Sequence, residues 1–120
     1  GSGCHTNFST KTMREGTGGM KYIDDMMKHF EAKHLLHMKL YGEGNDKRLT
    51  GEHETSSATK FSYGAGNRAA SFRIPPSTVA AAGQGYIEDR RPASNIDPYI
   101  VGAIMLSTAC LNGEGTEPMV

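Results

Sequence analysis

The chain has 120 residues, enough for one modest domain. Its 13 Lys and Arg balance its 13 Asp and Glu, which argues against a general nucleic-acid or membrane-surface binder, because such proteins carry a basic excess. Only 37% of the residues are hydrophobic and Trp is absent, which is little for a self-sufficient core, so we expect the chain to be part of something larger.

Residues 4–9 predict a short strand, in which alternation places His5, Asn7 and Ser9 on one face. A loop at 14–19 precedes the strongest helical pattern, at residues 20–40. The residues of one face recur there at three- and four-residue spacing: Ile23, Met26, Met27, Phe30, His34 and Met38. We therefore expect an amphipathic helix that packs through a Met-rich stripe.

Residues 45–70 are polar and rich in glycine, which predicts a long irregular stretch. Residues 70–75 alternate again and predict a second strand, with Arg73 on its polar face. Residues 85–91 predict a third strand, on which Tyr86, Glu88 and Arg90 share one face. Asp89 and Arg91 fall on the opposite face, where we expect them to brace the sheet or subunit contacts.

A second helix is predicted to begin at Asp97 and Pro98, a good N-cap followed by a good first residue. Residues 99–111 are nearly all apolar or small, so we expect this helix to be largely buried. Together the elements predict an α+β fold. Its antiparallel curved sheet, a portion of a half-barrel, would be backed by two helices.

Two cysteines, Cys4 and Cys110, lie far apart in the sequence, which is typical of reduced thiols in an intracellular protein. No apolar run approaches membrane-spanning length. The first residues lack the charged-then-apolar pattern of a secretory signal. We therefore predict a cytoplasmic protein with neither a membrane nor a nucleic-acid partner.

The polar faces of the three predicted strands carry side chains suited to metal and phosphate. His5 and Glu88 are ordinary ligands of a divalent cation, with Glu better suited to Mg²⁺ or Mn²⁺. Arg68 and Arg73 present planar forks that suit phosphate and carboxylate groups. If these faces meet in one concave sheet, the set suits phosphoryl transfer, in which positioning and charge neutralisation do most of the catalysis.

Simpler interpretations exist for each of these residues. A single strand histidine is more often structural than a ligand, and neighbouring arginines such as Arg90 and Arg91 more often form surface ion pairs. The helix histidines His29, His34 and His37 are poorly spaced for one zinc site, and no cysteine lies near them. The chemical hypothesis therefore depends on whether the faces converge.

Four segments occur in a characteristic order: GSGCHTNFSTKTMR, RLTGEHET, NRAASFRIP and GYIEDRRPASNIDPY. In this order and at these separations they resemble the C-terminal part of the catalytic domain of eukaryotic-type glutamine synthetase, and the resemblance covers nearly the whole chain. It implies ATP-dependent ligation of ammonia to L-glutamate through a γ-glutamyl phosphate. It also implies Mg²⁺ or Mn²⁺ ions, and stacked rings of subunits whose active sites lie between neighbours.

The resemblance also implies roles for individual residues. The implied metal ligands are His5 and Glu88. The implied ATP contacts are Asn7, Phe8, Ser9, Arg68, Arg73 and Tyr86. The implied grips on glutamate and the transferred phosphate are Arg48, Arg68 and Arg90. The implied catalytic residues are Arg68, Arg73 and Glu54, the last being a flap acid that closes the site and takes a proton from ammonium.

The chain departs from the family pattern at Glu52, Gly66 and Pro76. The family's N-terminal β-grasp domain and the strands that carry its other metal-binding glutamates have no counterpart in residues 1–120. We therefore expect these residues alone not to synthesise glutamine. The alternative is a non-catalytic fragment that binds nucleotide or serves only in assembly. An ATP–guanidino phosphotransferase fits less well, because it would not explain the flap acid.

Overall fold

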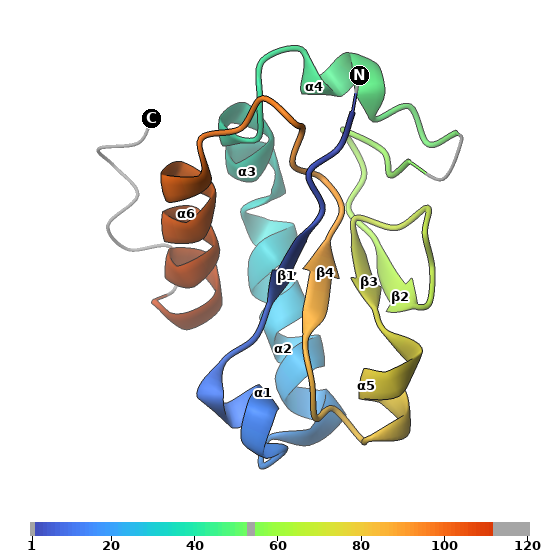
Figure 1. The fold of residues 1–120 in the computed structure, drawn as a ribbon, viewed down its shortest axis with the longest axis vertical. Helices are drawn as coiled ribbons and strands as arrows, with labels where there is room; N and C mark the ends of the chain where they lie inside the picture. The colour runs from blue at the N-terminus through green and yellow to red at the C-terminus, as the bar shows by residue number, and fades with distance from the viewer. Residues whose placement is uncertain (1, 53–54, 112–120) are drawn as a thin grey trace.

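The fold is mixed α/β, as a computed structural model shows for residues 2–52 and 55–111 (Figure 1). These described residues form four short strands and six helices. In chain order they are β1 Thr6–Phe8, α1 Lys11–Glu15, α2 Gly19–Ala32, α3 His34–Leu40, α4 Asn45–Arg48, β2 Tyr63–Ala65, β3 Phe72–Ile74, α5 Pro76–Ala80, β4 Ile87–Asp89 and α6 Pro98–Cys110.

The strands form one open sheet in the order β1-β4-β3-β2. The central strand β4 runs antiparallel to both β1 and β3, as predicted. The prediction of an antiparallel sheet is wrong for β2, which runs parallel to β3. Parallel neighbouring strands normally need a long crossover connection. Because a three-residue strand spans only about 10 Å, residues 66–71 are long enough to lead the chain from the end of β2 back to the start of β3. The curved half-barrel remains a prediction.

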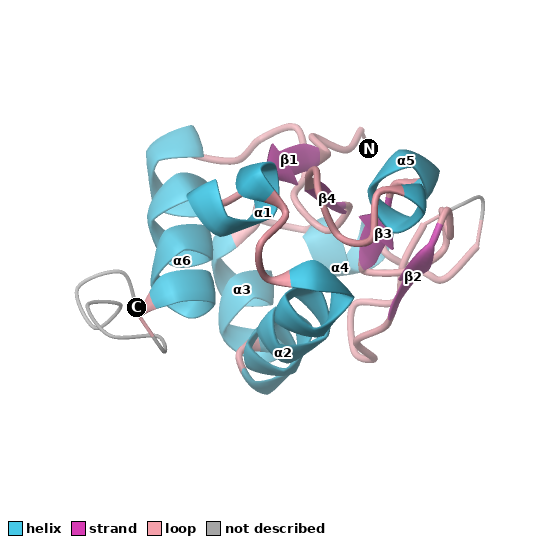
Figure 2. Cartoon of the chain, turned by 90° about the horizontal axis from the view of Figure 1, so that it is seen from below, coloured by secondary structure: helices cyan, strands magenta, loops and turns pink. Residues whose placement is uncertain are grey.

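Helices α2, α3 and α6 lie on one side of the sheet, as the view from below shows (Figure 2). The prediction of a single helix over 20–40 is wrong, because Lys33 departs from helical geometry (φ −107°, ψ 13°) and separates α2 from α3. The short helices α1, α4 and α5 were not predicted. The first, α1, is capped by Thr10, whose hydroxyl accepts from the amide of Met13 at 3.2 Å. The last, α5, has Pro76 in its first turn.

The core lies between the sheet and helices α2, α3 and α6. The predicted apolar stripe of α2 is buried and packs with strand side chains, and the rings of Phe30 and Phe72 are 4.5 Å apart between centroids. Ile74 and Ile87 continue this apolar layer across β3 and β4. Alternation along these strands therefore sends their polar side chains to the other side of the sheet.

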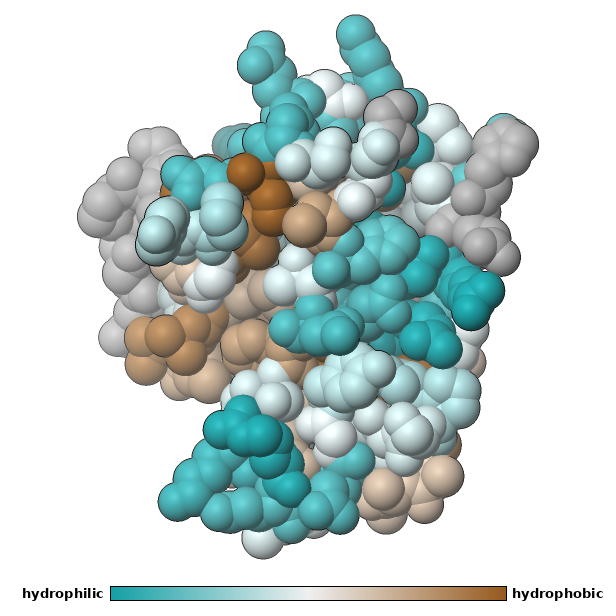
Figure 3. Space-filling view, in the orientation of Figure 1, coloured by the Kyte–Doolittle hydropathy of each residue, from teal (hydrophilic) through white to brown (hydrophobic). Residues whose placement is uncertain are grey.

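Helix α6 begins as predicted, with the Asp97 carboxylate accepting from the amide of Tyr99 at 2.9 Å. The prediction that it is largely buried is wrong for its outer side. Tyr99, Leu106 and the C-cap residue Leu111 are 88%, 52% and 51% exposed, because only one side of the helix meets the core. The helix is apolar around its whole circumference, so its outer side remains an exposed apolar surface. Figure 3 shows apolar surface toward α6 and hydrophilic surface over the sheet.

Behind the sheet, Asp89 and Arg91 form an ion pair that is fully buried. Arg91 donates from Nε to one Asp89 oxygen at 2.9 Å and from NH2 to the other at 3.0 Å. Its guanidinium also lies within 5.6 Å of the ring centroids of Tyr41, Phe61 and Phe72. Burial, the largest single influence, lowers the pKa of Arg91, but the charges and hydrogen bonds of Asp89 and Tyr41 together outweigh it, so the pKa is raised. The pair thus braces the sheet against α3, which is one of the two roles predicted for it.

Candidate functional site

The polar faces of the three predicted strands converge on the side of the sheet opposite the core. The register places Asn7 of β1 and Arg73 of β3 on either side of Glu88 in β4. His5 precedes β1 and Arg90 follows β4, so alternation gives them the same face. We call His5, Arg73, Glu88 and Arg90 the carboxylate cluster.

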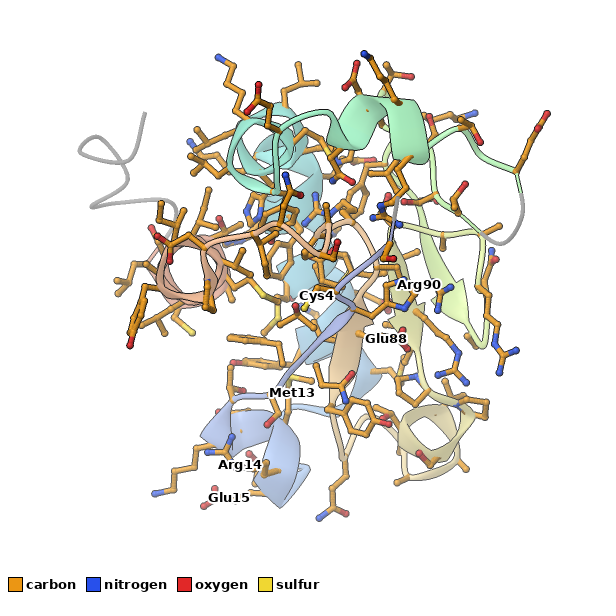
Figure 4. All side chains as sticks on the ribbon, turned by 45° about the horizontal axis from the view of Figure 1, so that its top comes forward. Cys4, Met13, Arg14, Glu15, Glu88 and Arg90 are labelled. Atoms are coloured by element: carbon orange, nitrogen blue, oxygen red, sulfur yellow. The ribbon has the colours of Figure 1, made fainter. Side chains whose placement is uncertain are left out.

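Glu88 is the centre of the carboxylate cluster. One of its oxygens, Oε1, lies 3.1 Å from Nδ1 of His5 and 3.0 Å from NH1 of Arg90. The other, Oε2, lies 3.3 Å from NH1 of Arg73. Glu88 and Arg90 lie close together along β4 in Figure 4. Three segments that are distant in sequence therefore direct their side chains at one partly buried carboxylate.

The cluster carries a surplus of positive charge. Two guanidiniums face one carboxylate, and His5 adds little, because burial and the charge of Arg90 lower its pKa despite the opposing effect of Glu88. A neutral imidazole is the form that binds metal ions. Nε of Arg73 is buried and has no hydrogen-bond partner among the described residues. The cluster can therefore accept more anionic oxygen than Glu88 supplies.

His5 and Glu88, the predicted metal ligands, lie in direct contact with each other. Adjacent ligands of an octahedral Mg²⁺ lie about 3 Å apart when each bond is about 2.1 Å. The separation of Nδ1 and Oε1, 3.1 Å, matches this spacing. No group of three or more His, Cys, Asp or Glu side chains within residues 2–52 and 55–111 could hold a metal. The described residues thus bring together only two candidate ligands, His5 and Glu88, and their role as metal ligands stays a prediction.

Arg48, a predicted grip on glutamate, is largely used within the fold. Its Nε donates to Asn45 Oδ1 at 2.9 Å, and its NH2 donates to the carbonyls of Arg91 at 3.0 Å and Pro92 at 3.2 Å. NH1 takes no part in these contacts. A Cβ added at Gly3 would lie 3.0 Å from this NH1 and 3.1 Å from Nε2 of His5, so Arg48 reaches the edge of the cluster.

Other predicted contacts lie apart from the cluster. Phe8 pairs with Ile87 and packs against the core, so its side chain is on the opposite side of the sheet. The Ser9 hydroxyl accepts from NH1 of Arg14 at 2.9 Å. Arg68 is exposed on the turn between β2 and β3. The role predicted for each of these residues stays a prediction.

Tyr86 and Glu54 are the two remaining predicted site residues. Tyr86 is exposed and comes directly before β4, on the face shared by Glu88. Glu54, the predicted flap acid, lies outside the described residues. Its role stays a prediction that rests on the resemblance alone.

A buried polar chain behind the cluster was not predicted from the sequence. Tyr41 donates to Asp89 at 2.8 Å, His37 lies 2.6 Å from the Tyr41 hydroxyl, and Thr108 of α6 lies 2.8 Å from the other nitrogen of His37. Burial, then the charge of Arg91, lowers the pKa of His37 to about 2, so its imidazole is neutral. The spacing of these residues could have revealed the chain. Positions 34, 37 and 41 continue the three- and four-residue spacing of the buried α2 stripe, but they carry polar rings in place of apolar side chains.

Comparison with known proteins tests the resemblance that the four segments carry. No family model matches the chain. It is, however, 60% identical over 110 residues to a glutamine synthetase of Saccharomyces cerevisiae. The chain is a homologue of eukaryotic glutamine synthetases. The resemblance carried by the four segments is thereby confirmed.

Two further glutamine synthetases show the same extent of similarity. The chain is 59% identical over 108 residues to that of Neurospora crassa and 57% identical over 112 residues to that of Suillus bovinus. The matches cover 90–93% of the chain but only 29–31% of the three curated relatives. The chain therefore spans less than a third of the length of the glutamine synthetases it matches.

Two of the departures from the glutamine synthetase pattern meet in the structure. Gly66 has a positive φ of 63°, and a Cβ there would contact Cγ of Pro76 at 3.6 Å. Because an added side chain would be strained by this φ, glycine suits the turn after β2.

In the part of the chain that the structure describes, no helix is both long enough and apolar enough to cross a membrane.

Proposed function

We propose that the chain contributes one wall of the active site of a glutamate–ammonia ligase. The reaction would join ammonia to the side chain of L-glutamate with hydrolysis of ATP, through a γ-glutamyl phosphate. The chain would correspond to the C-terminal part of the catalytic domain. The observation that carries the proposal is the convergence of His5, Arg73 and Arg90 on Glu88, together with homology to glutamine synthetases over nearly the whole chain.

The residues of the carboxylate cluster have complementary roles in this proposal. His5 and Glu88 would hold Mg²⁺ or Mn²⁺, which when bound neutralises phosphate charge. Arg73 and Arg90 would offset the charge that develops on the transferred phosphoryl group, since preorganised guanidiniums stabilise such groups strongly. Glu88 orients both arginines before a ligand arrives, which spares the cost of ordering them during binding.

The remaining assignments follow from the resemblance. Asn7 and Tyr86 would contact ATP from the open face, and NH1 of Arg48 would reach the glutamate carboxylate. Other subunits in a stacked ring would complete each site and supply further metal ligands. A cytoplasmic location is consistent with Cys4 and Cys110, which are both exposed and unpaired.

The proposal is tested by titrating ATP with Mn²⁺ into the chain and measuring heat. We expect metal-dependent ATP binding that weakens at least tenfold in Glu88→Gln, because this variant removes a metal ligand and the partner of two arginines. Glu15→Gln is the matched control: this glutamate pairs with Lys11 on α1, at 3.8 Å, and should bind like the parent chain.

Two results would count against the proposal. If ATP binds with equal affinity with and without Mn²⁺, or if Glu88→Gln binds as well as Glu15→Gln, the carboxylate cluster is not a metal–nucleotide site. The alternative, a chain that serves only in assembly, would then be favoured. We also expect the chain alone to show no glutamate- and ammonia-dependent ATP hydrolysis, which a coupled assay measures directly.

A further inference from the structure

A narrow loop base joins α4 to β2 beside the carboxylate cluster. It consists of residues 49–51 and 56–58, which pair antiparallel at Thr50 and Ser57. The amide of Ala58 donates to the Leu49 carbonyl at 3.1 Å, and the amide of Gly51 donates to the Ser56 carbonyl at 3.2 Å. Such a short ladder holds itself together weakly, so its position depends on what it packs against.

His34 of α3 lies between this loop base and the buried ion pair. Its Nε2 is 3.0 Å from the carbonyl oxygen of Ala58, and its Nδ1 is 2.9 Å from NH1 of Arg91. A carbonyl only accepts and a guanidinium only donates, so Nε2 carries the proton and Nδ1 offers its lone pair. Burial, then the charge of Arg91, lowers the pKa of His34, which is consistent with this neutral form.

Arg91 is a firm attachment point for such a contact. Its side chain is held by Asp89, and its carbonyl accepts from Nδ2 of Asn45 at 2.5 Å and from NH2 of Arg48 at 3.0 Å. The contact through His34 therefore joins the loop base to the segment directly after β4. Arg48, whose NH2 also binds the Arg91 carbonyl, immediately precedes the base in sequence.

We propose that His34 is a positioning residue that fixes the loop base against the end of β4. The two ring nitrogens act separately, since Nε2–H holds the loop base and Nδ1 holds Arg91. A histidine that only filled space in the core would not make a separate hydrogen bond with each of its two ring nitrogens.

The two nitrogens can be separated by substitution. In His34→Gln the side-chain amide lies as many bonds from Cβ as Nε2 does, so it can still donate to Ala58 while the acceptor for Arg91 is lost. In His34→Asn the carbonyl oxygen lies as many bonds from Cβ as Nδ1 does, so it can still accept from Arg91 while the donor to Ala58 is lost. Each variant is therefore the matched control for the other.

The experiment measures exchange of single backbone amides by NMR on the chain and both variants at pH 7. We expect the amides of Gly51 and Ala58 to exchange at least tenfold faster in His34→Asn than in His34→Gln. The amide of Met105 in α6, far from the loop base in sequence, should exchange at similar rates in the two variants.

Two results would overturn the proposal. Gly51 and Ala58 amides that exchange equally fast in the two variants would show that the Nε2 contact does not hold the base. Equal acceleration of these amides and of Met105 would show that His34 supports the whole core. No metal or nucleotide is present in the experiment, so its outcome is independent of the ATP titration.

Discussion

Replacement of Asp89 by asparagine tests how strongly the buried ion pair holds the sheet. The Asp89 carboxylate accepts four hydrogen bonds: three come from Arg91, through its amide, Nε and NH2, and one comes from the Tyr41 hydroxyl. Asparagine has one oxygen in place of two, so its NH₂ group would face donors. It would also leave the charge of Arg91 buried without a compensating negative charge.

The expected loss follows from this geometry. Breaking a buried pair by removing one partner costs about 3–5 kcal/mol. Unfolding entropy grows with chain length, so for a chain of 120 residues each kcal/mol lowers the melting temperature by about 4 °C. Asp89→Asn should therefore melt roughly 12–20 °C below the parent chain. The underlying loss of about 3–5 kcal/mol is a large part of the free energy of unfolding of a small domain.

Urea unfolding followed by circular dichroism measures this loss. Asp25→Asn is the control, because this carboxylate pairs with Lys21 at 2.7 Å on the surface of α2 and should leave the urea midpoint almost unchanged. The double variant Asp89→Asn/Arg91→Met should be more stable than Asp89→Asn, since it removes the unpaired charge. A loss below about 1 kcal/mol for Asp89→Asn, or a double variant less stable than the single one, would refute the reasoning.

Three further predictions concern the fold. The pKa of His37, about 2 in the folded chain, lies below its ordinary value of 6.5, so the unfolded state binds the extra proton and stability falls as the pH drops below 6.5. His37 should contribute a loss of about 1.4 kcal/mol per pH unit, visible in urea midpoints between pH 7.5 and 4.5, and His37→Gln should make the profile less steep. Gly83→Ala should lose more stability than Gly44→Ala. Both glycines have a positive φ, but a Cβ at Gly83 would lie 2.5 Å from the carbonyl carbon of Gly19, whereas a Cβ at Gly44 would meet nothing within 4 Å. The strain costs about 1–2 kcal/mol and the clash about 1–3 kcal/mol more; equal melting temperatures would contradict this. Asp97→Ala should cost about 1 kcal/mol, whereas Asp97→Asn keeps the cap and should melt like the parent chain.

The open face of the sheet could be predicted because side chains alternate along a strand. This rule placed His5, Arg73 and Glu88 on polar faces, and the register of β1, β4 and β3 brings those faces together. The same rule separated Asp89 and Arg91 from the cluster. The pairing itself could not be derived from periodicity, because it joins segments that are far apart in the chain.

Other features left little trace in the sequence. Strand β2 has no alternating apolar pattern, because Tyr63 and Ala65 lie on an exposed edge of the sheet. The break at Lys33 involves neither proline nor glycine, so the apolar stripe appeared continuous. The outer side of α6 is as apolar as its inner side, and composition alone does not reveal which side meets the core.

The separation of β1 from β4 has a consequence for how the chain folds during synthesis. Asn7 pairs with Glu88, so β1 has to wait until residues 87–89 have left the ribosome before it finds its neighbour in the sheet. Contacts between such distant segments form slowly, since a long loop must close first. Helix α2 can form early, whereas the carboxylate cluster can assemble only after β1, β3 and β4 have come together.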